Sequence, residues 1–218
     1  MTSEPAMPAG RWHFPSPLYA ILDPTQVRGR SLNSVLQGLL KGGAALTQLR
    51  ATEMNSQEFY QSALEARRLT RQNDCLFIVN DRADIALASQ ADGVHLGQGD
   101  LPLAVARKLM GKDKIIGIST HDLPQAEEAE QGGADYIGFG PIFGTTTKNT
   151  GYSPRGLTML REIRKKVKIP IVAIGGITED NVGQVWEAGA DAAAMISALM
   201  GVDDVADKVR KILALHQP

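Results

Sequence analysis

The 218-residue chain has one cysteine, about 5% aromatic residues and no excess of either charge. Cys75 has no second cysteine with which to form an internal disulfide, and the apolar run that follows it predicts a small buried side chain. A formal net charge of -1 gives no electrostatic argument for binding nucleic acid or a membrane surface. The composition therefore favours a small-molecule partner, and it leaves the oligomeric state open.

Long apolar runs are also missing, since none approaches the roughly 20 residues that a membrane span needs. Residues 1–17 lack a basic segment followed by an apolar one, so we expect a cytoplasmic protein. This segment has four prolines, at positions 5, 8, 15 and 17, which oppose regular structure. The sequence thus predicts a loose N-terminal tail over 1–17 and one catalytic domain over 18–218.

From Leu18 onward, short β-rich apolar runs alternate with segments of helical periodicity. The expected strands are 18–22, 45–50, 76–80, 93–96, 115–119, 136–139, 171–174 and 192–196. Helices are expected around 32–40, after Asn55, and at 83–89, 103–109, 123–131, 157–166, 181–188 and 204–214. Ser31 is a candidate helix cap, and Asn55 with Glu58 forms a candidate capping box. Eight such units predict an α/β protein, a single-domain (β/α)8 TIM barrel, with an open doubly wound sheet as the alternative.

A weak internal repeat precedes several of these strands. Asp92, Asp135 and Asp191 each follow an alanine directly before a strand begins. Such αβ turns lie on the stability face of a barrel, so we interpret the three aspartates as structural.

Polar residues gather instead at the C-terminal ends of the strands, where barrels assemble their chemistry. By the two-residue period of a strand, Gln48, Arg50 and Thr52 are expected to face inward. Further strand ends carry Asn80, Asp81, His95, Gln98, Asp100, Ser119, Thr120, His121, Gly175, Gly176, Ile196 and Ser197. Any one of these has a structural explanation, but their repetition around one rim favours an active site.

The segment from Gly140 to Lys148 has the composition of a phosphate-binding loop. Its glycines let backbone amides approach an anion, its threonines donate hydrogen bonds, and Lys148 adds a positive charge. The glycines after the seventh strand and Ser197 after the eighth occupy the place where barrels commonly bind a second phosphate. Two anion-binding regions suggest two phosphorylated substrates, or one substrate and a diphosphate leaving group.

Asp81 and Asp100 lie at or just beyond the ends of neighbouring strands, which are about 4.8 Å apart in a sheet. Oxygen ligands without a Cys and His cluster favour Mg²⁺, which takes one or two carboxylates plus water and substrate phosphate. Alternatively, Asp81 could pair with Arg82 or cap the next helix.

Taken together, these residues resemble the thiamin-phosphate synthase family, also called thiamin-phosphate pyrophosphorylase, from Leu18 to about Met200. The matching motifs are Gln48-Leu49-Arg50, Val79-Asn80-Asp81-Arg82, 92–98 with Asp100, 117–121, 138–143, 145–148, 173–177 and Met195-Ile196-Ser197. The resemblance implies that hydroxymethylpyrimidine diphosphate is joined to thiazole phosphate, which releases diphosphate and forms thiamin phosphate.

The resemblance also implies roles for individual residues. Asp81 and Asp100 would hold Mg²⁺, while Gln48 and Ser119 would orient the pyrimidine. The diphosphate would be bound by Arg50, Asn80, Thr145, Thr147 and Lys148, and the thiazole phosphate by Gly175, Gly176, Ile196 and Ser197. Arg50, Lys148 and Ser119 would be the catalytic set, and 149–155 is a candidate lid.

Thr52 is the main departure, because the family usually has lysine two residues after the arginine. Gly99 and Gly144 are milder departures, at positions where an acidic residue and a proline are common. Two alternatives stay open: a thiazole tautomerase-like isomerase that uses His121, and a noncatalytic protein that binds a phosphorylated ligand.

Overall fold

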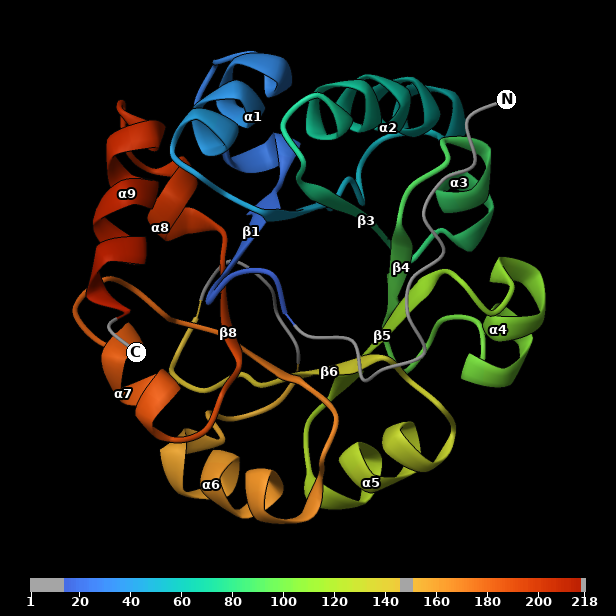
Figure 1. Cartoon of the computed structure of the whole chain (residues 1–218), viewed down its shortest axis with the longest axis vertical. Helices are drawn as coiled ribbons and strands as arrows, with labels where there is room; N and C mark the ends of the chain where they lie inside the picture. The colour runs from blue at the N-terminus through green and yellow to red at the C-terminus, as the bar shows by residue number, and fades with distance from the viewer. Residues whose placement is uncertain (1–13, 146–150, 217–218) are drawn as a thin grey trace.

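The computed structural model describes residues 14–145 and 151–216, which form a closed barrel of eight parallel strands in sequential order (Figure 1). Pairing between Leu18–Ala20 and Ala193–Met195 closes the sheet. The predicted (β/α)8 barrel is therefore confirmed, and the open doubly wound alternative is wrong. Helices surround the strands on the outside in Figure 1.

The bounds of the elements follow the sequence periodicity closely. The strands are β1 (Leu18–Leu22), β2 (Leu46–Leu49), β3 (Leu76–Asn80), β4 (Gly93–Leu96), β5 (Ile115–Thr120), β6 (Tyr136–Phe139), β7 (Ile171–Ile174) and β8 (Ala192–Met195). The helices are α1 (Leu32–Lys41), α2 (Ser56–Arg71), α3 (Ala83–Ala88), α4 (Leu103–Met110), α5 (Leu123–Gln131), α6 (Gly156–Lys166), α7 (Val182–Glu187), α8 (Ser197–Met200) and α9 (Val205–Leu215), with a 3-10 turn η1 (Pro24–Gln26) after β1.

Local capping explains where two of the helices begin. The Ser31 hydroxyl accepts a hydrogen bond from the Ser34 amide before α1, and Asn55 and Glu58 form the predicted reciprocal capping box before α2. The short helix α8 was not expected. It begins because Ile196, at φ -117° and ψ -82°, leaves the extended conformation one residue earlier than predicted.

Two apolar layers hold the barrel together. The larger one lies between strands and helices and includes Leu49, Val79 and Phe139. The smaller one fills the barrel interior around Tyr19 and Tyr136. Neighbouring residues of one strand point into different layers, as the period of two requires.

The three turn aspartates have the structural role that the sequence predicts. Each carboxylate accepts a hydrogen bond from a backbone amide at the start of the neighbouring strand, and each pairs with an arginine of a surrounding helix. The pairs are Arg67–Asp92, Arg107–Asp135 and Arg164–Asp191, with N···O distances of 2.7, 2.6 and 3.0 Å. These contacts stabilise the N-terminal face of the barrel, whereas active sites of such barrels lie at the opposite, C-terminal face.

The packed domain begins before Leu18. The ring of Phe14 lies 5.3 Å from that of Tyr136, edge to face, and the indole of Trp186 donates a hydrogen bond to the Pro17 carbonyl. Residues 14–17, which the sequence assigned to a loose tail, therefore contact the barrel. Residues 1–13 lie outside the described part of the chain.

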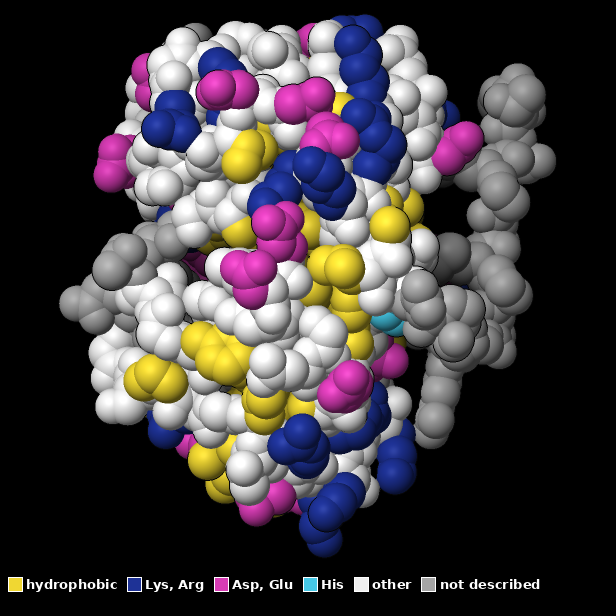
Figure 2. Space-filling model, turned by 90° about the vertical axis from the view of Figure 1, so that its left-hand side faces the viewer, with side chains coloured by type: hydrophobic (Ala, Val, Ile, Leu, Met, Phe, Trp, Pro, Cys, Tyr) yellow, Lys and Arg dark blue, Asp and Glu magenta, His cyan; other side chains and the backbone are white. Residues whose placement is uncertain are grey.

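The surface over α7 and α9 has Lys and Arg side chains intermingled with Asp and Glu (Figure 2). This face offers no large area of one sign, in keeping with the near-neutral composition. Within 14–145 and 151–216, none of the helices combines the length and the apolar character that crossing a membrane requires.

Burial is expected to make Cys75 unreactive. Desolvation raises the pKa of its thiol to about 12, so only on the order of one molecule in 10⁴ would carry a thiolate at pH 8. A thiol-specific chromogenic disulfide should therefore react slowly with the native protein and promptly with the unfolded one. Native reaction at the rate of a free model thiol would contradict this expectation.

Candidate active site at the C-terminal end of the barrel

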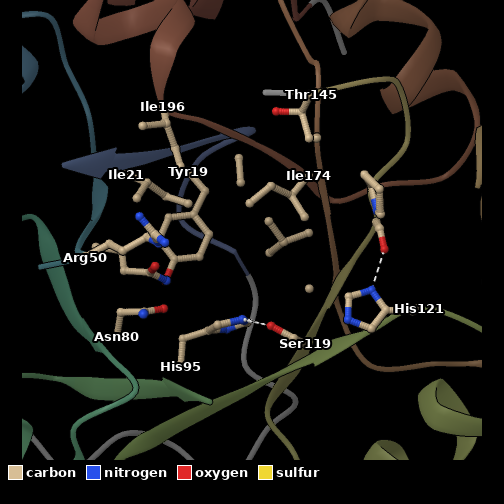
Figure 3. Close-up of a pocket in the computed structure, with 17 residues that line it drawn as sticks. Tyr19, Ile21, Arg50, Asn80, His95, Ser119, His121, Thr145, Ile174 and Ile196 are labelled. Carbon is tan, nitrogen blue, oxygen red and sulfur yellow. Dashed lines mark hydrogen bonds between the residues drawn. The ribbon is translucent and has the colours of Figure 1, made fainter. Parts of the chain in front are cut away.

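A pocket opens at the C-terminal end of the strands. It is lined by Gln48, Arg50, Asn80, Ser119, Thr145, Gly175 and Ile196, all predicted binding residues, together with Tyr19, Ile21, His95, His121, Gly138, Gly140, Pro141, Val172, Ile174 and Ala194. Figure 3 shows Arg50, Asn80, His95 and Ser119 on one side of this pocket, with Thr145 on another. The structure thus gathers most of the predicted set in one place.

The walls of the pocket differ in chemistry. Val172, Ile174, Ala194 and Ile196 give β7 and β8 an apolar face, whereas β2 to β5 contribute amide, guanidinium, imidazole and hydroxyl groups. One flat heterocyclic ring could contact the apolar wall while its polar edge met the opposite strands.

Arg50 is oriented by a carboxylate that the sequence analysis overlooked. Its Nη1 lies 2.5 Å from Oδ2 of Asp23, and the two side chains are only 15% and 2% exposed. Asp23 also accepts hydrogen bonds from the amide and hydroxyl of Thr25. Asp23 is therefore held in place at the end of β1, and it fixes the guanidinium at the rim of the pocket.

Asn80 and Asp81 follow each other at the end of β3, and only Asn80 lines the main pocket. Asn80 is buried and lines the main pocket. Asp81 adopts a left-handed φ of 64°, which few non-glycine residues accept, while its amide donates to the His95 carbonyl at 2.8 Å. Strained backbone of this kind concentrates at functional sites.

The two predicted metal carboxylates line the same open cavity beside the main pocket. The Gly97 amide donates to Oδ2 of Asp100 at 2.6 Å, which orients this carboxylate in the loop after β4. A smaller cavity is lined by Asn80, which also lines the main pocket, and by Asp81, which also lines the cavity with Asp100.

This donor set fits Mg²⁺ that is shared with a phosphorylated ligand. The two carboxylates offer hard oxygen atoms, and within 14–145 and 151–216 no group of three or more His, Cys, Asp or Glu side chains could form a closed metal cage. Mg²⁺ commonly binds through few carboxylates and completes its shell with water and phosphate. Asp81 and Asp100 are the residues that would hold the ion.

Thr52 does not face the main pocket. The strand β2 ends at Leu49, so the alternation expected to direct Thr52 inward stops before it. Thr52 is exposed and lines the small cavity with Asn80, Asp81 and Arg82. A lysine there would share this cavity with Asp81, one of the two predicted metal carboxylates. Arg82 itself pairs with Asp84 at 2.6 Å.

The predicted thiazole-phosphate region lies where β7 and β8 end. Gly175 and Gly176 have φ values of 103° and 64°, and a Cβ at Gly176 would meet the Gly144 carbonyl oxygen at 2.4 Å. These two positions therefore require glycine. Ser197 begins α8 directly after Ile196. Thr147 and Lys148, the other residues of the predicted phosphate loop, lie outside the described residues.

His121 also lines the pocket, on the side opposite Arg50 (Figure 3). Its Nδ1 lies 2.6 Å from the Gly140 carbonyl oxygen, to which it donates. Its ring stacks on Tyr152 with centroids 4.0 Å apart. The predicted lid segment, 149–155, is thus in contact with the pocket through Tyr152, and its residues 149–150 lie outside the described part of the chain.

Two polar residues of the interior, Tyr19 and Tyr136, were not singled out from the sequence, and His95 was noted only as a polar residue at a strand end. Tyr19 and Tyr136 share a hydrogen bond of 2.9 Å, and His95 contacts Tyr136 and Ser119 at 3.0 and 2.9 Å. Tyr19 could have been predicted from the sequence, because the two-residue period of a strand directs its side chain inward from β1.

Comparisons with known proteins agree with this geometry. Residues 18–199 match the family model described as thiamine monophosphate synthase. The thiamine-phosphate synthase of Chloroflexus aurantiacus is 48% identical over 198 residues, which cover 91% of each chain. That of Methanospirillum hungatei is also 48% identical over 198 residues, covering 91% of this chain and 96% of its own.

A solved structure supports the same assignment. Thiamine phosphate pyrophosphorylase from Pyrococcus furiosus is 39% identical and superposes with a TM-score of 0.83, covering 91% of this chain and 95% of that one. The sequence match, the identities and the shared barrel lead to one conclusion: the chain belongs to the thiamine monophosphate synthase family.

Proposed function

We propose that this barrel joins hydroxymethylpyrimidine diphosphate to thiazole phosphate, which forms thiamin phosphate and releases diphosphate. The observation that carries the proposal is one pocket in which Gln48, Arg50, Asn80, Ser119 and Thr145 meet beside the carboxylates of Asp81 and Asp100. The relatives named thiamine-phosphate synthase support it at high coverage. They do not favour a tautomerase that depends on His121 or a noncatalytic binding protein.

The reaction breaks the bond between the pyrimidine methylene carbon and a diphosphate oxygen, and it forms a bond from that carbon to the thiazole nitrogen. It needs stabilisation of the departing charge and alignment of the acceptor, with no protein nucleophile. Mg²⁺ held by Asp81 and Asp100 would supply Lewis-acid stabilisation of the leaving group.

Residues of the chain itself would bind the diphosphate, the pyrimidine and the thiazole phosphate. Arg50, fixed by Asp23, would donate to diphosphate oxygens, as would Asn80 and Thr145, together with Thr147 and Lys148. Gln48 and Ser119 would orient the pyrimidine against the apolar wall of β7 and β8. Gly175, Gly176, Ile196 and Ser197 would hold the thiazole phosphate. A buried free cysteine fits a reducing cytoplasm as the setting.

Complementation of a bacterium that lacks its own thiamine-phosphate synthase tests the proposal. Expression of the chain should restore growth without thiamin, and the same chain with Asp100→Ala should not. Failure of the wild-type chain to restore growth, despite soluble expression at the level of a working synthase, would count against this function.

Restoring the family lysine by Thr52→Lys should increase turnover. The new ammonium would lie in the cavity that contains Asp81, where it could reach a diphosphate shared with the metal. We expect a severalfold gain in kcat/KM for the pyrimidine diphosphate, measured at saturating thiazole phosphate. A Thr52→Met variant controls for side-chain length. No gain would mean that other cations already balance the diphosphate charge.

A further inference from the structure

Five polar side chains form a continuous hydrogen-bonded chain across the floor of the pocket. Gln48 Nε2 donates to the Tyr19 hydroxyl at 2.9 Å, and this hydroxyl lies 2.9 Å from that of Tyr136. Tyr136 contacts Nδ1 of His95 at 3.0 Å, and Nε2 of His95 lies 2.9 Å from the Ser119 hydroxyl. The chain therefore connects Gln48 with Ser119, the two residues proposed to orient the pyrimidine.

Glycine at one position in each of two strands, β5 and β6, leaves space for these hydrogen-bonded side chains. A Cβ at Gly117 would meet the ring of Tyr136 at 2.0 Å, and a Cβ at Gly138 would meet Cε1 of His95 at 2.9 Å. Glycine within a strand weakens it, so its presence often marks a close approach of other groups. The close approach here is that of the two rings at the centre of the chain.

One placement of the protons satisfies all four contacts and gives the hydrogen-bonded chain a direction. The Tyr19 oxygen accepts from Gln48, so its own single proton is available for the Tyr136 oxygen. Tyr136 can then donate to Nδ1 of His95, which leaves the imidazole proton on Nε2 for Ser119. This arrangement gives every proton along the chain an acceptor, which matters because Tyr19 and Tyr136 are almost completely buried.

Burial supports the assumption that each tyrosine keeps its proton. Desolvation raises the pKa of Tyr19 and that of Tyr136 above their ordinary value. Both hydroxyls therefore stay neutral, with one proton each, across the working pH range.

The two ends of the chain then have opposite character. Ser119 accepts from His95, so its hydroxyl proton is available to a ligand in the pocket. Gln48 donates one of its two amide N–H bonds to Tyr19, which turns the amide so that its carbonyl oxygen can accept from a ligand. The pocket thus offers a donor from β5 and an acceptor from β2.

We propose that Tyr19, Tyr136 and His95 are positioning residues that fix Ser119 as a donor and Gln48 as an acceptor, and so set the preference for an aminopyrimidine over its oxo counterpart. This inference rests on the proposed function. A 4-aminopyrimidine presents a ring nitrogen that accepts beside an amino group that donates. The 4-oxo analogue presents the reverse pair, a ring N–H that donates beside a carbonyl that accepts.

Calorimetric titration with the 4-amino and 4-oxo pyrimidine diphosphates tests the proposal without requiring turnover. The wild-type protein should bind the amino compound at least about 100-fold more tightly, since a mismatched hydrogen-bonding edge is strongly rejected. Tyr136→Phe should reduce this ratio about 10-fold, because His95 and Tyr19 each lose a partner. Tyr19→Phe should act in the same direction. Tyr60→Phe on α2 is the matched control and should change nothing.

A positional role is separated from a structural one by two further readouts. The KM for thiazole phosphate should stay unchanged in Tyr136→Phe. Nitrogen NMR of the wild-type imidazoles, assigned with His95→Gln, should show His95 protonated on Nε2 and unprotonated on Nδ1. The opposite tautomer, or an unchanged amino-to-oxo ratio in both phenylalanine variants, would overturn the proposal.

The outcomes also distinguish this inference from the proposed function. Wild-type protein that binds neither pyrimidine diphosphate would overturn both. Normal synthesis of thiamin phosphate with no preference for the amino compound would overturn the positioning role alone. Folding of each variant is checked by thermal unfolding, and a large loss of stability in Tyr136→Phe leaves Tyr19→Phe as the deciding variant.

Discussion

Asp100→Ala is expected to reduce diphosphate release by roughly 10³-fold or more, because the proposed Mg²⁺ would contribute several kcal/mol of charge stabilisation. Asp100 and Asp81 line one cavity, and the Gly97 amide orients the Asp100 carboxylate. Removing one carboxylate would leave Mg²⁺ with a single protein ligand. Steady-state diphosphate release over a range of Mg²⁺ concentrations measures the effect.

Two variants make the Asp100 result specific. Asp100→Asn keeps an oxygen that can accept from Gly97 but removes the negative charge, so a metal role predicts that it fails like alanine. Asp113→Ala, at an exposed turn before β5, should keep wild-type turnover. Normal activity in both Asp100 variants would exclude Asp100 from the metal site.

Arg50→Ala is the second change with a large expected effect, about 10²-fold to 10³-fold in kcat. This is the usual cost of removing one preorganised donor to a developing negative charge. The effect should be strong here because the chain has Thr52 where the family resemblance implies a lysine, which leaves fewer cations for the diphosphate. By the same reasoning from sequence, Lys148→Ala should cause a comparable loss.

Arg50→Ala also removes the partner of Asp23, a carboxylate whose side chain is 2% exposed. Loss of stability must therefore be separated from loss of catalysis. Arg50→Lys keeps the charge but not the planar donor geometry, so it should recover stability more fully than kcat. Arg68→Ala removes an exposed ion pair with Glu65 and is the control. Wild-type kcat in Arg50→Ala would refute its role with the diphosphate.

Local sequence patterns were sufficient to predict the barrel. The alternation of apolar runs with helical periods located all eight strands, and Asn55 with Glu58 located the start of α2. The bounds differed where backbone geometry rather than side-chain pattern decides, as at Ile196, whose dihedral angles end β8 and begin α8. Isoleucine is common in strands, so its presence at position 196 does not indicate that the strand ends there.

Site residues at the C-terminal ends of strands could be predicted from the sequence. Contacts between residues far apart in the sequence could not. Gln48, Asn80 and Ser119 could be placed because a closed parallel barrel brings its C-terminal ends together. The contact between Tyr19 and Tyr136 joins residues 117 positions apart, and periodicity cannot pair them. Thr52 was misplaced because the alternation was extended beyond the end of β2.

The central claim is that this barrel transfers the pyrimidine group to thiazole phosphate. The most direct measurement incubates the purified chain with both substrates, with and without Mg²⁺, and follows thiamin phosphate and diphosphate together. The proposed function predicts equal amounts of the two products, formed only when both substrates and Mg²⁺ are present. Isomerisation of the thiazole substrate without diphosphate release, or tight binding without any product, would contradict it.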